Sequence, residues 1–329
     1  MTRKHASMCC SGKPKSNKGD DKRLPMTCGI RLTPSEHSIA IISDDGDFVY
    51  QAAFPPADGY TALLPQLAGA ITDACSASEI SSPIGICIQG HETAADGTIK
   101  SLHHPMLDGK PLRRDLQAAL NRPVIVASEG QCLASAARQQ PHLSDKTTIF
   151  ALSLDSFVCG GIIVNDHMLT GAHGFAGDWG HLSLPWPVDF ELDGRVCLCG
   201  RTGCLEHFVN LPGLAHDYEM LTGSSLSATE IIDRAAKGDI VAESAMQVIE
   251  DRIARGLAMV IGLLDPDVIV VGGILADSPR LFTAVPRKWP GYIRISKANN
   301  ILRPICEDGQ TRTDSYLIGA AELHKYVQP

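Results

Sequence analysis

The sequence predicts an α/β protein with two lobes that face a cleft. Two observations carry this prediction. Each half of the 329-residue chain opens with a β-meander, and each half then continues as βα units. Two such halves, each able to bury its own core, are typical of paired α/β lobes around a binding cleft. We place the lobes at residues 27–145 and 146–329, after a basic tail at residues 1–26.

The first lobe begins with a predicted hairpin, because two apolar, β-rich runs flank the turn sequence DDG. Alternating helices and strands follow, identified by apolar spacing. The expected elements are strands at 38–43 and 47–54, a helix at 60–77, a strand at 84–90, an extended segment at 97–102, a helix at 111–120, a strand at 123–130 that runs into a loop, and a helix at 131–139.

The second lobe repeats this order. Ser227 and Glu230 have the spacing of a capping box, which predicts where a helix begins. The closing helix is expected to pack back toward the first lobe. The expected elements are strands at 147–154 and 159–169 with a turn at Asn165–Asp166, helices at 227–239 and 240–265, a strand at 266–273 and a closing helix at 315–327.

Composition and charge exclude several classes of protein. The net charge is −8, which argues against general nucleic-acid binding, although residues 1–26 carry seven Lys/Arg and two Asp. That polar tail is expected to be disordered. There is no run of about 18 apolar residues and no apolar core of a secretory signal, so we expect a cytoplasmic protein without a membrane segment. The 11 cysteines are not interpreted as a disulfide framework.

One cluster of metal-ligand residues stands out. His181, Cys197, Cys199 and Cys204 supply one imidazole and three thiolates, a set suited to tetrahedral zinc. Glycines at 200 and 203 allow the chain to turn tightly, so that the three sulfurs can converge. Four protein ligands leave no open position, which favours a structural zinc site. A redox pair and unrelated buried thiols are the alternatives.

The segments around this cluster resemble the ROK family (repressors, open reading frames, sugar kinases). The resemblance rests on GFAGDWGHLSLPWP, CLCGRTGCLEHF, DGKPLRRDL, LDPDVIVVGG and GAA, and it extends over nearly the whole chain after the tail. The fructokinase and N-acetylglucosamine kinase branch is the most similar. The resemblance implies a two-lobed, actin-like and hexokinase-like ATPase fold with ribonuclease H-like lobes. It also implies ATP-dependent sugar 6-phosphotransfer, a homodimer, and a structural zinc beside the sugar pocket.

The resemblance also implies a set of sugar-binding residues. Asp178 stands where the family has a glutamate, and Glu206 and the metal-binding His181 match the family pattern. His103 stands in place of a family asparagine, and Gly90 fits a tight turn near the sugar. Without the resemblance, Asp178 and Glu206 would be interpreted as a solvated pair or as support for the cysteine cluster.

The phosphate side departs from the family at three places. The family loop Asp-x-Gly-Gly-Thr reads RLTPS from Arg31, and the second loop, Gly-Thr-Gly-x-Gly, reads DSFVC from Asp155. Side chains and a proline in place of glycines hinder the approach of a phosphate to the backbone. The catalytic aspartate corresponds to Glu129, while Gly272 and Gly273 keep the adenosine-side glycine pair. The sequence therefore argues against strong binding of ATP and Mg²⁺.

Three hypotheses follow from this mixture. The first is a sugar-kinase homologue that binds a hexose or N-acetylhexosamine beside a structural zinc and has lost most or all phosphotransfer. The second is an active kinase that forms a sugar 6-phosphate with Glu129 as the base. The third is a repressor, which is disfavoured because about 26 residues before the first strand are too few for a DNA-reading unit.

Overall fold

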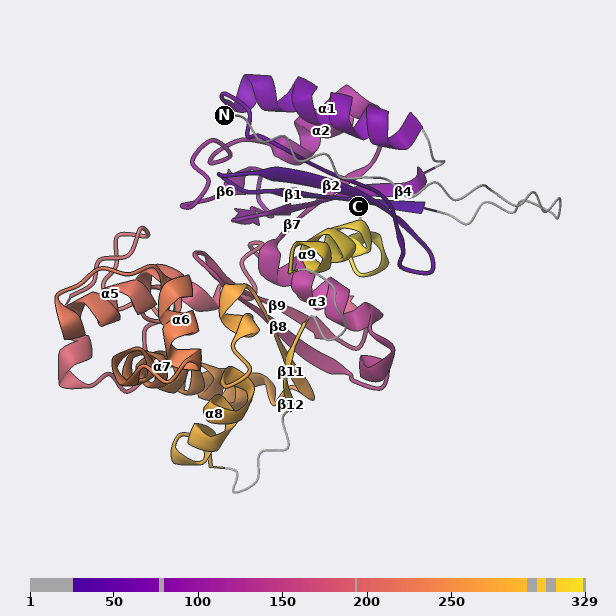
Figure 1. Ribbon diagram of the computed structural model, residues 1–329. Helices are drawn as coiled ribbons and strands as arrows, with labels where there is room; N and C mark the ends of the chain where they lie inside the picture. Colours follow the sequence, from indigo (N-terminus) through magenta and orange to yellow (C-terminus); the bar gives the residue numbers. More distant parts are fainter. Residues whose placement is uncertain (1–25, 77–79, 193, 295–300, 306–311, 328–329) are drawn as a thin grey trace, which may run out of the picture.

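The chain folds into two α/β layers stacked one above the other (Figure 1). The computed structural model describes residues 26–76, 80–192, 194–294, 301–305 and 312–327. The predicted tail at residues 1–26 therefore lies outside the described residues, except for Met26, which begins the first strand.

Each layer is built on a five-stranded sheet. The first sheet has the order β3-β2-β1-β4-β7, in which the β1–β2–β3 meander is antiparallel and β4 and β7 are added in parallel. Its strands are β1 Met26–Leu32, β2 His37–Ser43, β3 Phe48–Phe54, β4 Ile80–Ile88 and β7 Val124–Ser128. A small hairpin of β5 His91–Glu92 and β6 Ile99–Lys100 lies beside it.

The second sheet repeats the plan with the order β10-β9-β8-β11-β12. Its strands are β8 Thr148–Leu154, β9 Val158–Val164, β10 His167–Met168, β11 Val268–Gly272 and β12 Ile301–Pro304. Asn165 and Asp166 have φ values of 49° and 62°, as a type I′ hairpin turn requires. The predicted α/β architecture with two sheets is therefore confirmed.

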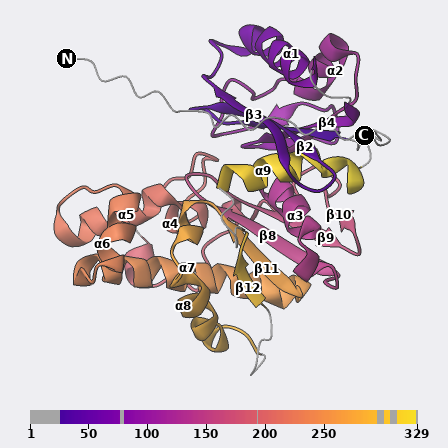
Figure 2. The same cartoon turned by 45° about the vertical axis from the view of Figure 1, so that its right-hand side comes forward.

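The helices fall into three groups (Figures 1 and 2). Those of the first lobe lie on the outer face of its sheet, those of the second lobe share a core with the face of its sheet that points away from α3, and two lie between the sheets. They are α1 Tyr60–Ser76 and α2 Leu112–Leu120; α4 Glu206–Val209, α5 Leu211–Thr222, α6 Ala228–Ala236, α7 Ile240–Leu264 and α8 Leu281–Lys288; and α3 Glu129–Gln139 and α9 Arg312–Ala321. Within the described ranges, none of the helices combines the length and the apolar character that a membrane crossing needs.

Helix α9 packs directly on the first sheet and on α3, although it comes last in the chain (Figure 2). Glycines make this approach possible. A Cβ atom at Gly29 would lie 2.1 Å from the carbonyl oxygen of Leu317, and one at Gly319 would lie 1.8 Å from that of Cys132. Side chains larger than hydrogen at these positions would push the layers apart. The close contact holds α9 tightly between the first sheet and α3.

Most of the predicted elements are present, and two helices differ from the prediction in their bounds. Residues 129–130 begin α3 instead of forming a loop, because Ser128 and Gln131 form a reciprocal capping box. Helix α9 begins at Arg312, ends at Ala321 and is followed by a 3-10 turn at Leu323–Lys325. Helices α4, α5 and α8 and strands β1 and β12 were not among the expected elements.

Candidate functional site

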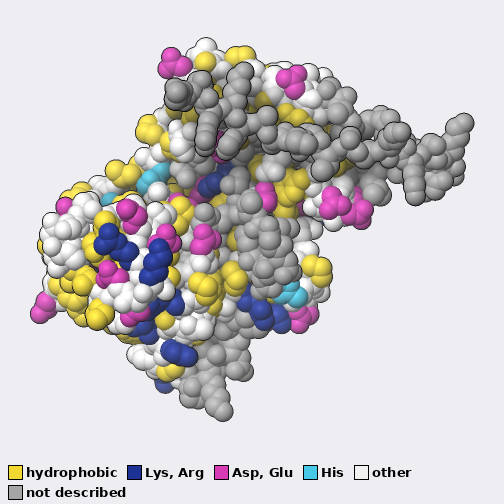
Figure 3. Space-filling model, viewed as in Figure 1, with side chains coloured by type: hydrophobic (Ala, Val, Ile, Leu, Met, Phe, Trp, Pro, Cys, Tyr) yellow, Lys and Arg dark blue, Asp and Glu magenta, His cyan; other side chains and the backbone are white. Residues whose placement is uncertain are grey.

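A cavity of about 380 Å³ lies between the two lobes. Gly90, His91 and His103 line it from the first lobe, and Asp178 and His181 line it from the second. The surface view shows histidine side chains gathered at the waist between the lobes (Figure 3). We call this space the interlobe cavity. Four of the residues that the resemblance implies for sugar binding, Gly90, His103, Asp178 and His181, therefore line this cavity.

Gly90 shapes the floor of the interlobe cavity. Its φ of 156° and its crowded surroundings exclude a side chain, since a Cβ atom would lie 2.6 Å from the carbonyl oxygen of Lys100. The Ser101 hydroxyl donates a hydrogen bond to the carbonyl oxygen of Gln89 and fixes the same turn. The tight turn predicted at Gly90 is present and exposes His91 and His103 to the cavity.

His103 and Glu206 form a pair across the lobes. His103 Nε2 lies 2.9 Å from Oε1 of Glu206, and the Val158 N–H donates to the same oxygen at 3.3 Å. Glu206 is only 1% exposed. Its burial alone would raise the pKa of its carboxyl, but His103, His181 and the Val158 N–H together lower that pKa. Glu206 therefore lies behind His103 as a carboxylate rather than on the cavity wall.

His91 is a cavity residue that the sequence analysis did not select. It is 5% exposed, its ring centroid lies 5.0 Å from that of Phe175, and its Nε2 lies 3.9 Å from Oδ1 of Asp178. Burial lowers the pKa of His91, although the Asp178 carboxylate opposes this effect. A neutral imidazole can both donate and accept a hydrogen bond. The only sequence signal for His91 is its position directly after Gly90.

The cysteine–histidine cluster has the dimensions of a tetrahedral metal site. All four ligand atoms lie within 4.8 Å of one another. His181 Nδ1 lies 3.5 Å from Cys197 Sγ, and Cys199 Sγ lies 3.6 Å from Cys204 Sγ. Zinc bonds of about 2.3 Å to sulfur and about 2.0–2.1 Å to nitrogen give tetrahedral edges of roughly 3.8 Å and 3.6 Å. The four residues therefore fit a zinc ion.

Burial works against ionisation of one of the four ligands, the thiol of Cys197. Burial raises the pKa of Cys197 to about 12. A buried thiol of this kind stays protonated unless a positive charge stabilises its thiolate. The turn that brings the sulfurs together contains Gly200 and Gly203, with φ values of 83° and 78°. The predicted glycine turn is thus present.

Buried ion pairs anchor the long loop between His181 and Cys197 to helix α7. Glu191 accepts from Arg252 Nε at 2.8 Å and from Arg255 Nη1 at 2.8 Å, and all three side chains are buried. Removing one partner of such a pair leaves an uncompensated charge in the interior. The loop that carries His181 is therefore fixed to the core of the second lobe.

Glu129 is the residue in the position of the family's catalytic aspartate, and it is 0% exposed. Arg31 donates to its Oε1 from Nη2 at 2.6 Å and from Nε at 3.1 Å. Gln89 donates to the same oxygen at 3.3 Å, and the Ser153 hydroxyl donates to Oε2 at 3.4 Å. The Arg31 guanidinium also stacks on the ring of Tyr316 at 4.1 Å. Both oxygens of Glu129 are thus occupied by protein donors.

The second loop that differs from the family pattern contains its own anion. Asp155 Oδ1 accepts from the Ser156 N–H at 2.7 Å, and its Oδ2 accepts from the Ile274 N–H at 3.2 Å. A carboxylate of the chain thus occupies backbone donors that could otherwise face a phosphate. Gly273 has a φ of 88°, and a Cβ atom there would lie 2.3 Å from the carbonyl oxygen of Leu154.

The predicted site residues therefore divide into two groups. Gly90, His103, Asp178 and His181 line the interlobe cavity, with Glu206 directly behind them. Among the described residues, the lining of this cavity does not include Glu129, Gly272 or Gly273. The sugar-side residues are gathered around one space, whereas the residues predicted for catalysis and adenosine binding do not line it.

Comparisons with known proteins agree with this architecture. The chain is 31% identical over 275 residues to the N-acetyl-D-glucosamine kinase of Escherichia coli O127:H6, covering 82% of this chain and 90% of the relative. The ROK hexokinase of Thermus thermophilus superposes with a TM-score of 0.76 at 24% identity, covering 90% of this chain and 96% of that one.

A ROK family glucokinase from Streptomyces griseus, solved with glucose and AMPPNP, superposes with a TM-score of 0.75 at 19% identity, covering 91% of this chain and 98% of that one. The sequence model of the ROK family matches residues 27–327, which include both sheets, the cysteine–histidine cluster and the closing helix. The protein is a homologue of the ROK sugar kinases, and the chain belongs to the ROK family.

Proposed function

We propose that this protein binds a hexose or N-acetylhexosamine in the interlobe cavity and that its ATP-dependent phosphotransfer is weakened or lost. The observation that carries the second part is the Arg31–Glu129 pair. A general base must reach the hydroxyl whose proton it removes. Glu129 has no exposed surface, and two donors of Arg31 hold the same carboxylate oxygen.

The sugar part of the proposal rests on the groups that face the interlobe cavity. The Asp178 carboxylate can accept hydrogen bonds from sugar hydroxyls, and the imidazoles of His91 and His103 lie in the same wall. The name of the curated relatives, N-acetyl-D-glucosamine kinase, favours an N-acetylhexosamine among the candidate sugars. Phe157 and Phe175 add apolar rings to the lining, against which the carbon face of a sugar can pack.

We further propose that His181, Cys197, Cys199 and Cys204 hold a structural zinc. A bound zinc would offset two of the three thiolate charges and fix the ring of His181, which also lines the interlobe cavity. With four protein ligands the ion has no open position, so its contribution is to the shape of the wall rather than to chemistry. By family resemblance we also propose a homodimer, which light scattering can test.

The two loops that correspond to the family's phosphate-binding loops carry charges that disfavour phosphotransfer from ATP. Arg31 stands where the family has an aspartate, and a guanidinium cannot coordinate Mg²⁺. Asp155 adds a carboxylate on the backbone donors of the second loop, and this charge repels a triphosphate. ATP binding would therefore require both loops to rearrange.

The second candidate is an active sugar kinase with Glu129 as the base. The names of the curated relatives favour it, because the similarity covers 82% of the chain. This function requires the Arg31–Glu129 pair to open when substrate binds. The pair is buried, so its opening is costly unless a ligand replaces the lost contacts.

A sugar panel with two assays tests the proposal. Calorimetric titration with hexoses and N-acetylhexosamines should detect binding, and a coupled assay with Mg·ATP should detect no sugar 6-phosphate. Asp178→Asn should weaken sugar binding at least about tenfold, because a charge-assisted hydrogen bond is lost. The matched control is Asp58→Asn in the exposed bend before α1, which should leave sugar binding unchanged. Ordinary turnover that Glu129→Gln abolishes would establish the active kinase instead.

A further inference from the structure

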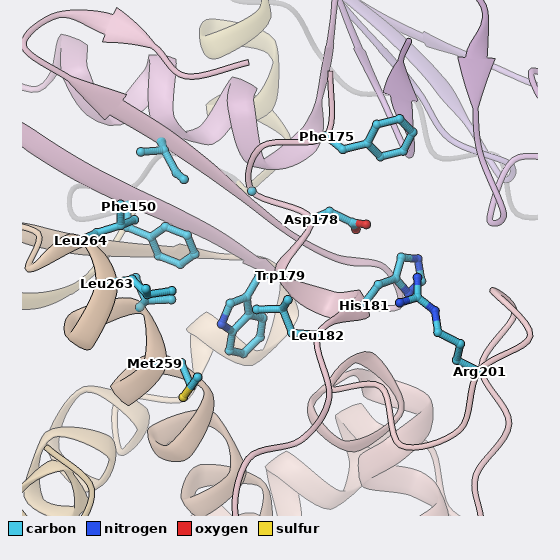
Figure 4. A pocket seen from close by; sticks show the side chains of 13 residues that line it. Phe150, Phe175, Asp178, Trp179, His181, Leu182, Arg201, Met259, Leu263 and Leu264 are labelled. Atoms are coloured by element: carbon cyan, nitrogen blue, oxygen red, sulfur yellow. The ribbon is translucent and has the colours of Figure 1, made fainter. Parts of the chain in front are cut away.

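A second cavity lies beside the interlobe cavity, on the side of the second lobe. It measures about 410 Å³ and shares four lining residues with the interlobe cavity, namely Phe175, Asp178, His181 and Arg201. The close-up shows Asp178, His181 and Arg201 at one end of it (Figure 4). The two spaces are therefore neighbours that meet at a polar wall.

The remainder of the second cavity is apolar, and we call this part the apolar annex. Its charged or titratable lining residues are the three at the shared wall. Away from that wall, the side chains come from β8, β9, α7 and the two residues Trp179 and Leu182 on either side of the His181 turn (Figure 4). The annex is lined chiefly by Phe150, Trp179, Leu182, Met259, Leu263 and Leu264.

The sizes of the two spaces exceed what a single sugar needs. Pockets for small ligands typically measure about 300–1,000 Å³, so each space alone reaches that range. The annex also leaves apolar side chains open to water, with Met259 41% and Leu263 78% exposed. An apolar group that covered them would bind favourably, whereas a sugar hydroxyl placed there would lose its hydrogen bonds to water.

We propose that the ligand is an amphiphilic sugar, a hexose or hexosamine that carries an acyl or alkyl chain of several carbons. The sugar ring occupies the interlobe cavity, and the chain passes Phe175 and Asp178 into the apolar annex. This inference rests on the proposed sugar-binding function and specifies its ligand class. The polar wall between the two spaces matches the junction between the ring and the chain of such a molecule.

Calorimetry with an N-acyl series tests the inference. N-acetyl-, N-butanoyl- and N-hexanoylglucosamine, together with methyl, butyl and hexyl β-D-glucosides, are titrated into the full chain below their micelle concentrations. Each methylene that enters the annex should tighten binding up to about fourfold, so the N-hexanoyl compound should bind far more tightly than the N-acetyl compound.

Two variants locate the effect. Met259→Trp fills part of the annex, so the ratio of N-hexanoyl to N-acetyl affinity should fall toward 1. Met220→Trp makes the same substitution at an exposed position of α5, away from both cavities, and should keep the ratio of the unaltered chain. The two affinities that form a ratio are measured on the same variant. A general loss of folded protein therefore affects both and cancels in the ratio.

The outcomes separate this inference from the proposed function. If plain sugars bind and chain length has no effect, the annex is not a ligand site and only this inference fails. If none of the sugars binds, the proposed function fails with it. Light scattering identifies a further result that would contradict the inference. In that result a second copy of the protein covers the annex, so that Met259→Trp dissociates the dimer and the length of the acyl chain again has no effect.

Discussion

The Arg31–Glu129 pair can be tested by removing one charge at a time. Glu129→Gln keeps the size of the side chain but leaves the Arg31 guanidinium without its counter-ion. Arg31 is 15% exposed and Glu129 is 0% exposed, so water cannot replace the lost partner. Breaking a buried pair in this way typically costs about 3–5 kcal/mol. We expect that loss in the free energy of unfolding.

The double variant supplies the second half of the test. Arg31→Met alone should cost a similar amount, because the Glu129 carboxylate is then left buried and unpaired. The combination of Arg31→Met with Glu129→Gln removes both charges, and we expect it to recover at least about 2 kcal/mol of the summed loss. Urea unfolding followed by circular dichroism measures all three variants, since the midpoint shifts in proportion to stability.

The matched control is Glu219→Gln on the exposed face of α5, which should change stability by less than about 0.5 kcal/mol. The structural role of Glu129 is refuted by one pattern. In that pattern, the Glu129→Gln variant is as stable as the unaltered chain. In addition, the unaltered chain phosphorylates sugar and the variant does not.

Three further predictions concern the metal, the first lobe and the sheet contact. Metal analysis should find one zinc per chain, and Cys204→Ser should remove it and lower stability by several kcal/mol. Burial, with the neighbouring His37, lowers the pKa of His104 to about 4. The unfolded chain therefore binds the extra proton first, and stability should fall by about 3 kcal/mol as the pH drops from about 6.5 to 4. His104→Gln should flatten this dependence in urea titrations at several pH values. Gly29→Ala should cost at least about 3 kcal/mol by the same method, because its Cβ meets a backbone oxygen at 2.1 Å, whereas Gly69→Ala in α1 has free space and should be neutral or stabilising.

Local chemistry predicted much of the fold. The DDG turn is present with Gly46 at a φ of 85°, and the Asn165–Asp166 turn has the expected positive φ values. Ser227 and Glu230 form the capping box that their spacing indicated. These features could be predicted because each depends on residues within a few positions of one another.

Contacts between distant segments were beyond the reach of such patterns. Arg31 and Glu129 are 98 positions apart, and no local spacing relates them. The sequence analysis identified both residues as departures from a family motif, but their pairing depends on how β1 and α3 meet. His91 was missed for the same reason, since it became a cavity residue only when the second lobe brought Phe175 and Asp178 against it.

The cysteine cluster shows where spacing and resemblance agreed with the structure. His181 lies 16 positions before Cys197, yet the two ligand atoms are 3.5 Å apart. The spacing of the three cysteines indicated their convergence, because a glycine-containing turn of that length has few other solutions. The approach of His181 to the cysteines could not be predicted from spacing, because ion pairs between its loop and α7 help to hold that loop in place.

The most direct test of the central claim is calorimetric titration of the zinc-loaded full chain with Mg·ATP in the presence of saturating N-acetylglucosamine. The account predicts no saturable heat from the nucleotide up to millimolar concentrations, because Asp155 occupies a backbone donor of the second loop and Arg31 stands where the family has an aspartate. Nucleotide binding at micromolar concentrations, accompanied by formation of a sugar phosphate, would contradict it.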